Sequence, residues 1–382
     1  MKKVLVIHNR YRNIGGEDIA VEKEVELLKT KYNVESLIFE NSEKINFLNL
    51  IYFLLNKNHK SVKKLKDIVE KFKPDVVYVH NTWFNASIGV LEYLLEKNIN
   101  VVLKLHNFRY FCTKSYLVKN HRLKSFQCSC CAMDFKKYKF FNKYFEESIA
   151  KSIFVNRYGV KYFKLLKNSN FKIIVLTNFH KEFLASNGIR LNSVYVNSNP
   201  LEIDLIQNSG FNSNYIVYAG RISNEKGITK LIDTFLKTNL EEIILKIVGD
   251  GPDLVKLKEV YNSHKVEFLG SVVNSHVLEI ISNSIAVVTN TKLYEGQPTV
   301  LMEASFLGIP SIFPDNGGIA EFFPQNYPLK FKSNNSEDLM QKLLLLKKRK
   351  YLKKLGAENK LFISDMLNTN KILLNFERII ND

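Results

Sequence analysis

The chain has 382 residues, of which 46% are hydrophobic and 12% aromatic. The length exceeds what a single hydrophobic core usually accommodates, so two domains are expected. The apolar composition excludes a disordered chain. Its 55 Lys and Arg outnumber 38 Asp and Glu, so the formal net charge is +17. Such a charge favours partners that carry phosphate, although a lysine-rich solvated surface explains it equally well. The first apolar run covers only residues 4–7, and no stretch approaches about 18 apolar residues. We therefore expect a cytoplasmic protein without a signal peptide or transmembrane helix, at most touching the inner face of the membrane.

Short apolar runs alternate with amphipathic stretches along the first half of the chain. Helical patterns cover residues 17–30, 62–72 and 87–96. Buried parallel strands are predicted at residues 3–8, 34–39, 75–79, 101–105, 172–176 and 194–196. This alternation predicts a parallel sheet that is covered by helices on both faces.

The alternation pauses at a polar stretch, residues 197–214, and then resumes. Further strands are predicted at residues 215–219, 243–248, 266–269, 285–289 and 310–313. The expected fold class is therefore α/β, with two Rossmann-like doubly wound domains facing a cleft. The expected boundaries are 1–198 and 199–365, with a helix at about 366–382 packing back on the first domain. Ligands should bind at the carboxyl ends of the strands.

A glycine pair follows the first strand. Gly15 and Gly16 leave the loop without side chains, and Glu17 opens the next helix. Backbone N–H groups at such a helix start can approach a phosphate. A tight turn that binds nothing remains the alternative.

Two cations follow the strand at residues 215–219, in the segment YAGRISNEKG. Gly220 turns the chain, and Arg221 and Lys226 lie on the loop before the next helix. Together they can bind a diphosphate, Arg as a fork and Lys as a point charge. The alternative is a pair of solvated loop charges. The segment IVGDGP, residues 247–252, repeats the strand, glycine turn and helix geometry next door, and a turn that binds nothing is again the alternative.

Two carboxylates lie in the segment YEGQPTVLMEA. Glu295 belongs to a Gly/Pro loop, and Glu303 lies inside a helix predicted to start near Thr299. Carboxylates accept hydrogen bonds from sugar hydroxyls, so one could hold a hexose and the other a ribose. We expect Glu303 to point back toward the loop that carries Glu295.

All four cysteines lie within twenty residues of one another. Cys128 and Cys131 have the spacing of a metal knuckle, and Cys112, His106 and His121 are nearby as further ligands. A structural zinc held by Cys112, Cys128 and Cys131 is one interpretation. Reduced thiols in a loop are the other, since disulfides are not expected in a reducing cytosol.

Residues 136–172 contain ten Lys or Arg and two acidic residues, interleaved with Phe and Tyr. Basic-aromatic helices of this kind bind anionic membrane surfaces, where a lipid-linked acceptor would lie. A solvated helix face over an ordinary core explains the pattern equally well.

The segments YAGRISNEKG and IVGDGP and the E-x7-E spacing from Glu295 to Glu303 together resemble the retaining glycosyltransferase family 4 of GT-B fold. The segments GGED, LHNFRYFC and CSCC further resemble a bacterial branch that builds surface and capsular polysaccharides. The resemblance implies a hexosyl-type transferase with a nucleotide-sugar co-substrate, UDP-linked before GDP-linked, and with no required cofactor. The acceptor would be a glycan or a lipid-linked saccharide.

The resemblance also implies roles for individual residues. Arg221 and Lys226 would neutralise the diphosphate, and Glu303 would bind the ribose. His106 would lie near the reacting sugar, as a catalytic residue together with Arg221, Lys226 and Glu295. The remaining donor contacts would come from Gly15, Gly16, Gly220, Glu295, Gly296 and Gln297. The acceptor hydroxyl would attack on the face that the diphosphate leaves, and a phosphate oxygen would take its proton.

One departure limits this inference. Many relatives have E-G-F-G where this chain has Glu295, Gly296, Gln297 and Pro298, and Pro298 lacks a backbone N–H. The identity of the sugar is therefore left open. A nucleotide-sugar epimerase of the same fold and a basic nucleic-acid-binding protein are the alternative functions. No nucleic-acid-binding module is recognisable, so we expect no nucleic-acid partner.

Overall fold

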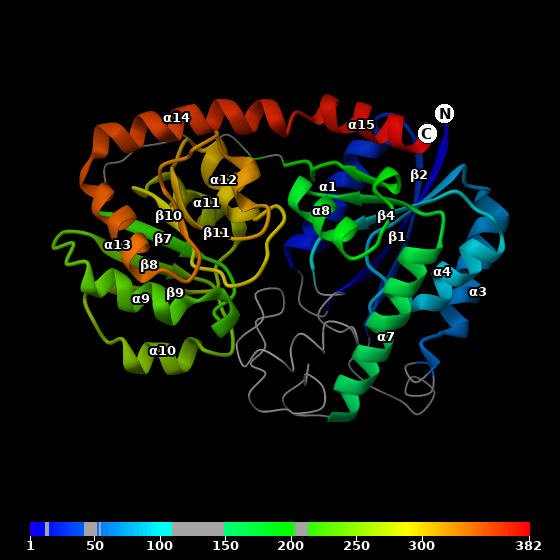
Figure 1. The fold of residues 1–382 in the computed structure, drawn as a ribbon, viewed down its shortest axis with the longest axis horizontal. Helices are drawn as coiled ribbons and strands as arrows, with labels where there is room; N and C mark the ends of the chain where they lie inside the picture. The colour runs from blue at the N-terminus through cyan, green and yellow to red at the C-terminus, as the bar shows by residue number, and fades with distance from the viewer. Residues whose placement is uncertain (12–14, 42–51, 53–54, 109–148, 202, 204–212) are drawn as a thin grey trace. The chain divides into compact units, whose positions relative to one another are not determined.

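The computed structural model describes the chain except for residues 12–14, 42–51, 53–54, 109–148, 202 and 204–212 (Figure 1). The chain forms two compact units. The N-terminal unit comprises Met1–Pro200 and Thr369–Asp382, and the C-terminal unit comprises Leu201–Asn368. Within the described parts of the chain, no helix combines the length and the apolar character needed to cross a membrane.

The N-terminal unit contains a six-stranded sheet in the order β2-β1-β3-β4-β5-β6, and all of its pairings are parallel. Its strands are β1 (Lys3–Arg10), β2 (Asn33–Glu40), β3 (Val76–Val79), β4 (Val101–Leu105), β5 (Lys172–Val175) and β6 (Val194–Val196). Its helices are α1 (Gly16–Lys29), α3 (His59–Phe72), α4 (Ile88–Glu96), α7 (Ile149–Asn168), α8 (Asn178–Ser186), α15 (Thr369–Asn381) and the 3-10 turn η1 (Leu191–Ser193).

The sheet of the N-terminal unit is covered on both faces. Strands β3 and β4 are buried along their whole length, which explains their continuous apolar sequences. Helix α15 packs on α1, and its Phe376 ring lies 4.9 Å from the ring of Tyr78 in β3. Helices α3, α4 and α7 pack in sequence as a second group (Figure 1).

The C-terminal unit contains a second six-stranded sheet, in the order β12-β11-β10-β7-β8-β9 and again parallel. Its strands are β7 (Tyr215–Ala219), β8 (Ile244–Val248), β9 (Val266–Gly270), β10 (Val287–Val288), β11 (Ser311–Asp315) and β12 (Lys330–Lys332). Its helices are α9 (Ile228–Lys237), α10 (Leu254–Val260), α11 (Asn274–Ser282), α12 (Thr299–Phe306), α13 (Ser336–Leu344) and α14 (Arg349–Met366), and its 3-10 turns are η2 (Asn224–Lys226), η3 (Ile319–Phe322) and η4 (Leu345–Lys347).

Both units are therefore parallel α/β domains of Rossmann-like topology, which confirms the predicted fold class. In each sheet, successive strands are added first on one side of the starting strand and then on the other. This reversal of strand order lies next to β1 in the first sheet and next to β7 in the second. Loops that follow strands at such a reversal form the usual ligand-binding edge of this fold. Gly15 follows β1, and Gly220, Arg221 and Lys226 follow β7, so these predicted site residues lie next to the two reversals.

Candidate active site

The loop that follows β7 carries Gly220 and Arg221. Gly220 has a φ of +147°, a conformation that other residues rarely adopt. The Tyr218 hydroxyl donates a hydrogen bond of 2.8 Å to the Arg221 carbonyl, which fixes the backbone of the turn. The Arg221 side chain is exposed, and it forms no ion pair with any described residue. It is thus a cation held on a fixed backbone and open to a ligand.

The glycines of IVGDGP support this loop by close packing. A Cβ atom on Gly249 would lie 2.0 Å from the Gly220 carbonyl oxygen, and one on Gly251 would lie 2.2 Å from the Ile222 carbonyl oxygen. Both distances are far below van der Waals contact, so only glycine fits. The segment therefore has a packing role, in agreement with its interpretation as a turn.

Lys226 and Glu295 form an ion pair in the C-terminal unit. Lys226 Nζ lies 2.5 Å from Glu295 Oε1, and the Thr291 hydroxyl donates to the same oxygen at 3.2 Å. The two charged side chains are about one-quarter exposed. The residue predicted to bind the diphosphate and the residue predicted to bind the sugar thus lie in direct contact, although they are 69 residues apart in the sequence.

The backbone of Glu295 is anchored by the loop that follows β11. Glu295 forms an isolated parallel bridge with Gly317, and its carbonyl accepts a 2.9 Å hydrogen bond from the Gly318 N–H. A Cβ on Gly317 would lie 2.7 Å from the Glu295 nitrogen and oxygen. Two strand-end loops therefore hold the carboxylate in place.

Helix α12 begins at Thr299, as predicted. Pro298 is its N-cap, and the Pro298 carbonyl accepts from the Leu301 N–H at 3.0 Å. Because proline has no N–H, the start of this helix offers one backbone donor fewer to a ligand. Glu303 lies in the second turn and is only 6% exposed, while Gly296 is buried and Gln297 is partly exposed.

The glycine loop of the N-terminal unit begins helix α1, as predicted. Gly15 is the N-cap, and its N–H donates a 2.8 Å hydrogen bond to Asp18 Oδ2. Asp18 Oδ1 lies 2.8 Å from His8 Nε2. Burial alone would raise the pKa of Asp18, but the hydrogen bonds from His8 and from the N–H groups of Gly15 and Tyr11 outweigh it and hold the pKa below its usual value.

Glu17 connects this loop to the end of β4. Its Oε2 accepts hydrogen bonds from the Tyr11 hydroxyl at 2.8 Å and from Asn107 Nδ2 at 2.9 Å. Asn107 directly follows His106, so the glycine loop and His106 lie along the same edge of the sheet. The sequence predicts that the glycine pair and His106 each follow a strand, but it does not identify the Glu17 contact.

His106 forms a hydrogen bond with a histidine that the sequence analysis did not identify. His106 Nε2 lies 2.9 Å from His80 Nδ1, and the two rings are stacked with centroids 5.2 Å apart. Burial lowers the pKa of both rings well below 6.5, and the neighbouring charge of Lys104 lowers both further. His8 lies near the end of β1, and His80 and His106 directly follow the next strands of the sheet, β3 and β4. This repetition is the sequence signal that could have revealed the cluster.

The predicted zinc ligands Cys112, Cys128 and Cys131 lie outside the described residues, as does His121. Within the described ranges, no three His, Cys, Asp or Glu side chains are arranged to hold a metal ion. The structural zinc therefore stays a prediction.

Solved glycosyltransferase structures have a similar fold. The chain aligns over its whole length with sucrose-phosphate synthase from Thermosynechococcus elongatus, covering 98% of that chain with a TM-score of 0.72 and 15% identity. It aligns equally completely with Anabaena HepE in complex with UDP and glucose, with a TM-score of 0.70 and 14% identity. The protein therefore has the GT-B fold.

A family model matches much of the C-terminal unit. Residues 203–361 match the model described as glycosyl transferases group 1. The chain is also 30% identical over 173 residues to the amylovoran biosynthesis glycosyltransferase AmsD of Erwinia amylovora, a match that covers 43% of this chain. The same match spans about half of the relative, 49% of its length.

Proposed function

We propose that the protein is a retaining glycosyltransferase of family 4 type. It would transfer a hexosyl unit from a nucleotide-sugar donor to a saccharide or lipid-linked saccharide acceptor in the synthesis of a bacterial surface polysaccharide. The observation that carries the proposal is the contact between Lys226 and Glu295, together with the exposed cation Arg221 on the loop that leads to Lys226. The group 1 family match and the resemblance to AmsD support the reaction class. The UDP bound by the structural neighbour HepE supports a UDP-sugar as donor.

In the proposed reaction, the bond between the sugar C1 and the diphosphate oxygen breaks while a new bond forms between C1 and the acceptor oxygen. Arg221 and Lys226 stabilise the charge on the leaving diphosphate. Glu295 orients the donor sugar through its hydroxyls and does not attack C1. A phosphate oxygen takes the proton of the acceptor hydroxyl, so atoms and charge balance. Glu303 binds the ribose, and no cofactor takes part.

The contact between Lys226 and Glu295 implies an exchange of partners when the donor binds. The carboxylate holds the ammonium group of Lys226 at 2.5 Å and takes one of its three N–H donors, so it competes with a phosphate for this cation. A diphosphate carries more negative charge than one carboxylate, so it would attract the ammonium group away. Glu295 would then be released toward the sugar.

Thermal shift with UDP-sugars and GDP-sugars tests the donor. A ligand at a hundred times its dissociation constant stabilises the folded protein by about 2.7 kcal/mol. Among variants, Arg221→Ala should lower turnover about a hundredfold, which corresponds to about 3 kcal/mol. Lys237→Ala, which removes an exposed cation at the end of α9, serves as the control.

The proposal fails if no nucleotide sugar stabilises the protein, or if Arg221→Ala and Glu303→Ala both turn over as fast as the wild type. A nucleotide-sugar epimerase would instead convert the donor with no acceptor present.

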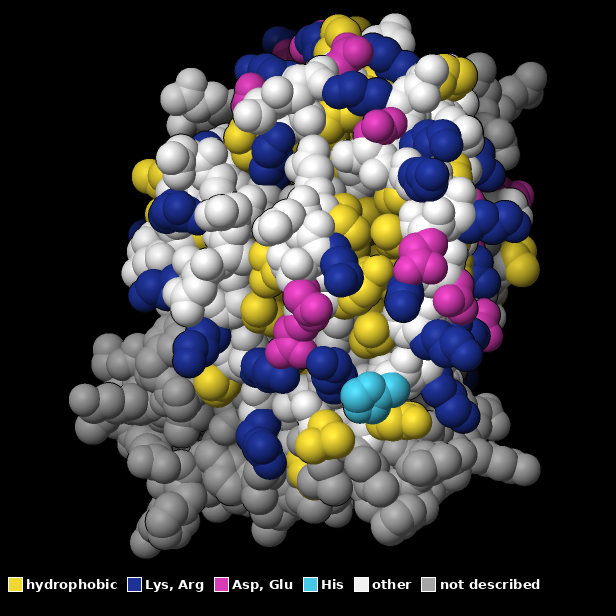
Figure 2. Space-filling view, turned by 90° about the vertical axis from the view of Figure 1, so that its right-hand side faces the viewer, with side chains coloured by type: hydrophobic (Ala, Val, Ile, Leu, Met, Phe, Trp, Pro, Cys, Tyr) yellow, Lys and Arg dark blue, Asp and Glu magenta, His cyan; other side chains and the backbone are white. Residues whose placement is uncertain are grey.

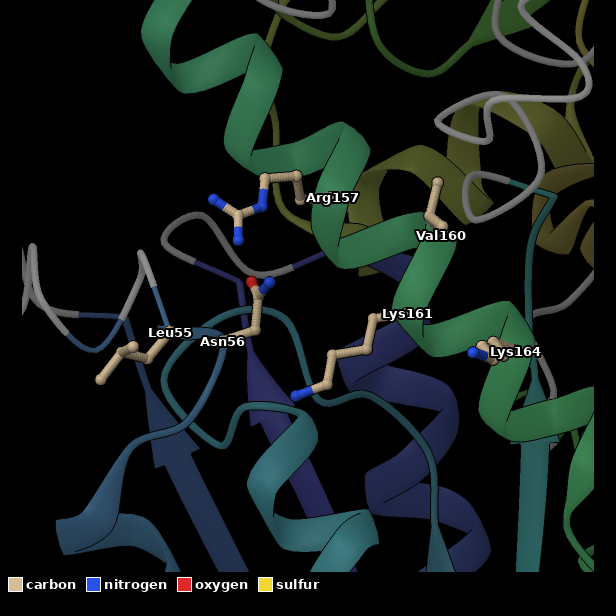
Figure 3. Close-up of a pocket in the computed structure, with 6 residues that line it drawn as sticks. All are labelled: Leu55, Asn56, Arg157, Val160, Lys161 and Lys164. Atoms are coloured by element: carbon tan, nitrogen blue, oxygen red, sulfur yellow. The ribbon is translucent and has the colours of Figure 1, made fainter.

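We further propose that the acceptor side lies near an anionic membrane surface. Helix α7, which is part of the basic-aromatic segment 136–172, lines a pocket of about 420 Å³. Arg157, Lys161 and Lys164 line this pocket, and Figure 3 shows Arg157 and Lys161 extending from α7 toward Asn56. Lys161 pairs with Glu92 at 2.8 Å. Figure 2 shows Lys and Arg side chains spread over the face of the molecule that it draws.

Sedimentation with phosphatidylglycerol vesicles tests this part. Each cation near an anionic surface contributes about 1 kcal/mol, so Arg157→Ala/Lys164→Ala should bind about thirtyfold more weakly. Lys350→Ala/Lys353→Ala, which removes two exposed cations of α14, is the control. Wild-type protein that stays in the supernatant at low salt would refute membrane contact and leave the transferase proposal standing.

A further inference from the structure

The pair formed by His80 and His106 is an enclosed polar contact at the edge of the N-terminal sheet. His80 directly follows β3 and is 2% exposed, and His106 directly follows β4. The 2.9 Å distance joins His80 Nδ1 to His106 Nε2. Two neutral imidazoles can make this hydrogen bond only if one nitrogen carries the proton and the other does not. The tautomers of the two rings are therefore coupled.

Two arrangements satisfy the bond. In the first, His80 Nδ1–H donates to His106 Nε2, which leaves the proton of His106 on Nδ1. In the second, His106 Nε2–H donates to His80 Nδ1, which leaves the proton of His80 on Nε2. Among the described residues, neither His106 Nδ1 nor His80 Nε2 has a hydrogen-bond partner, and both atoms are buried. The first arrangement leaves the His106 N–H without an acceptor, and the second leaves the His80 N–H without one.

The surroundings favour the first arrangement. His80 is enclosed by the ring of Tyr78 at 4.4 Å and the ring of His8 at 6.3 Å, so an N–H on its far side would have no route to an acceptor. The His106 side chain is partly exposed at the ligand-binding edge although its Nδ1 is buried, so a ligand that displaces the groups covering Nδ1 supplies the acceptor for this N–H.

We propose that His80 is a positioning residue that fixes the ring of His106 and places its proton on Nδ1, as a hydrogen-bond donor to the transferred sugar. The proposal rests on the proposed function for its catalytic consequence. Because Nδ1 is shielded from water, its hydrogen bond to a sugar oxygen is stronger than a solvated one. The buried ammonium group of Lys104, which lies 2.9 Å from each of the two carboxylate oxygens of Glu24, keeps positive charge beside the pair and disfavours protonation of either ring.

Two substitutions at His80 distinguish positioning from packing. His80→Phe keeps an aromatic ring against Tyr78 but removes the nitrogen. His80→Asn loses the ring but places an amide nitrogen at the position of Nδ1. If His80 positions His106, His80→Phe should lower kcat at least tenfold, and His80→Asn should stay within about threefold of the wild type. A packing role predicts the reverse order, with activity following the melting temperature.

The activity assay is release of UDP from UDP-glucose, UDP-galactose and UDP-N-acetylglucosamine, with UDP binding measured in parallel. Equal kcat for His80→Phe and the wild type would overturn the proposal. A second measurement needs no activity: nitrogen NMR of the imidazole rings, in a chain with only eight histidines. We expect His106 Nε2 without a proton in the wild type, and a mixture of tautomers in His80→Phe. A proton on Nε2 of wild-type His106 would overturn the positioning itself. If the wild type releases no UDP but shows the expected tautomer, the proposed function fails and the positioning stands.

Discussion

Substitution of Gly249 by alanine should damage both the fold and the donor site. The φ of Gly249 is +133°, which alanine rarely adopts, and the added Cβ would lie 2.0 Å from the Gly220 carbonyl oxygen. The neighbour is backbone, so relief requires the β7 loop to move. Backbone strain of about 1–3 kcal/mol and overpacking of similar size predict a loss of about 3 kcal/mol in the free energy of unfolding. The shifted loop carries Arg221, so UDP affinity should fall about tenfold as well.

Gly270→Ala is the matched control. Gly270 also has a positive φ, +71°, but nothing lies within 4 Å of its added Cβ. It should cost about 1 kcal/mol, the penalty for a left-handed alanine, and leave UDP binding unchanged. Urea denaturation gives the stabilities, and calorimetric titration with UDP gives the affinities. The reasoning would be refuted if Gly249→Ala unfolded at the same urea concentration as Gly270→Ala and bound UDP as the wild type does.

Three further predictions concern buried or paired charges. Burial lowers the pKa of His180 to about 3, whereas the unfolded chain should have the usual value of about 6.5. Between these two pH values the unfolded state binds more protons than the folded state, so the free energy of unfolding falls as the pH drops. From pH 7 to pH 5 the free energy of unfolding should fall by about 2 kcal/mol because of His180, and His180→Phe should remove this loss when urea denaturation is measured at both pH values. The same pH dependence in the variant and the wild type would contradict the assignment. Lys104→Met leaves the carboxylate of Glu24 buried without its cation and should lower the free energy of unfolding by about 3–5 kcal/mol in urea denaturation. The double variant Lys104→Met/Glu24→Gln should restore most of this loss. An equal loss in the double variant would contradict the pairing. Glu295→Gln releases Lys226, so UDP should bind about threefold more tightly while UDP release from the donor slows; weaker UDP binding would show that the carboxylate does not compete with the phosphate.

Most of the fold could be predicted because buried parallel strands are apolar along their whole length. Residues 101–105 and 215–219 were predicted with the bounds that the structure gives to β4 and β7. Strand β12 (Lys330–Lys332) was missed because a strand of three residues is too short for a periodic signal. Its one buried side chain, Phe331, lies between two lysines. Strand β10 is shorter than the predicted 285–289 because its parallel pairing with β11 covers only Val287–Val288, although the Ile285 N–H donates a hydrogen bond to the Tyr215 carbonyl.

The candidate site was predictable where the sequence places a charged residue beside a glycine turn. Arg221, Lys226 and Glu295 were identified in this way. The contact between Lys226 and Glu295 was not predictable, because it depends on how the loops after β7 and β10 meet. His80 was missed for a different reason: a single histidine after an apolar strand looks like a capping residue until its partner His106 is located in space.

The charges at the two sheet edges suggest how the chemistry is divided between the units. Helix α1 begins with Glu17 and Asp18, so carboxylates already lie where a helix start would attract an anion, and the Gly15 N–H is bonded to one of them. The loops of the C-terminal unit instead present Arg221, with no ion-pair partner among the described residues, and Lys226, with a partner that a diphosphate can displace. Charge neutralisation of the leaving group should therefore depend on the C-terminal unit. The N-terminal unit is better suited to neutral hydrogen bonding, through the histidine pair, to a sugar.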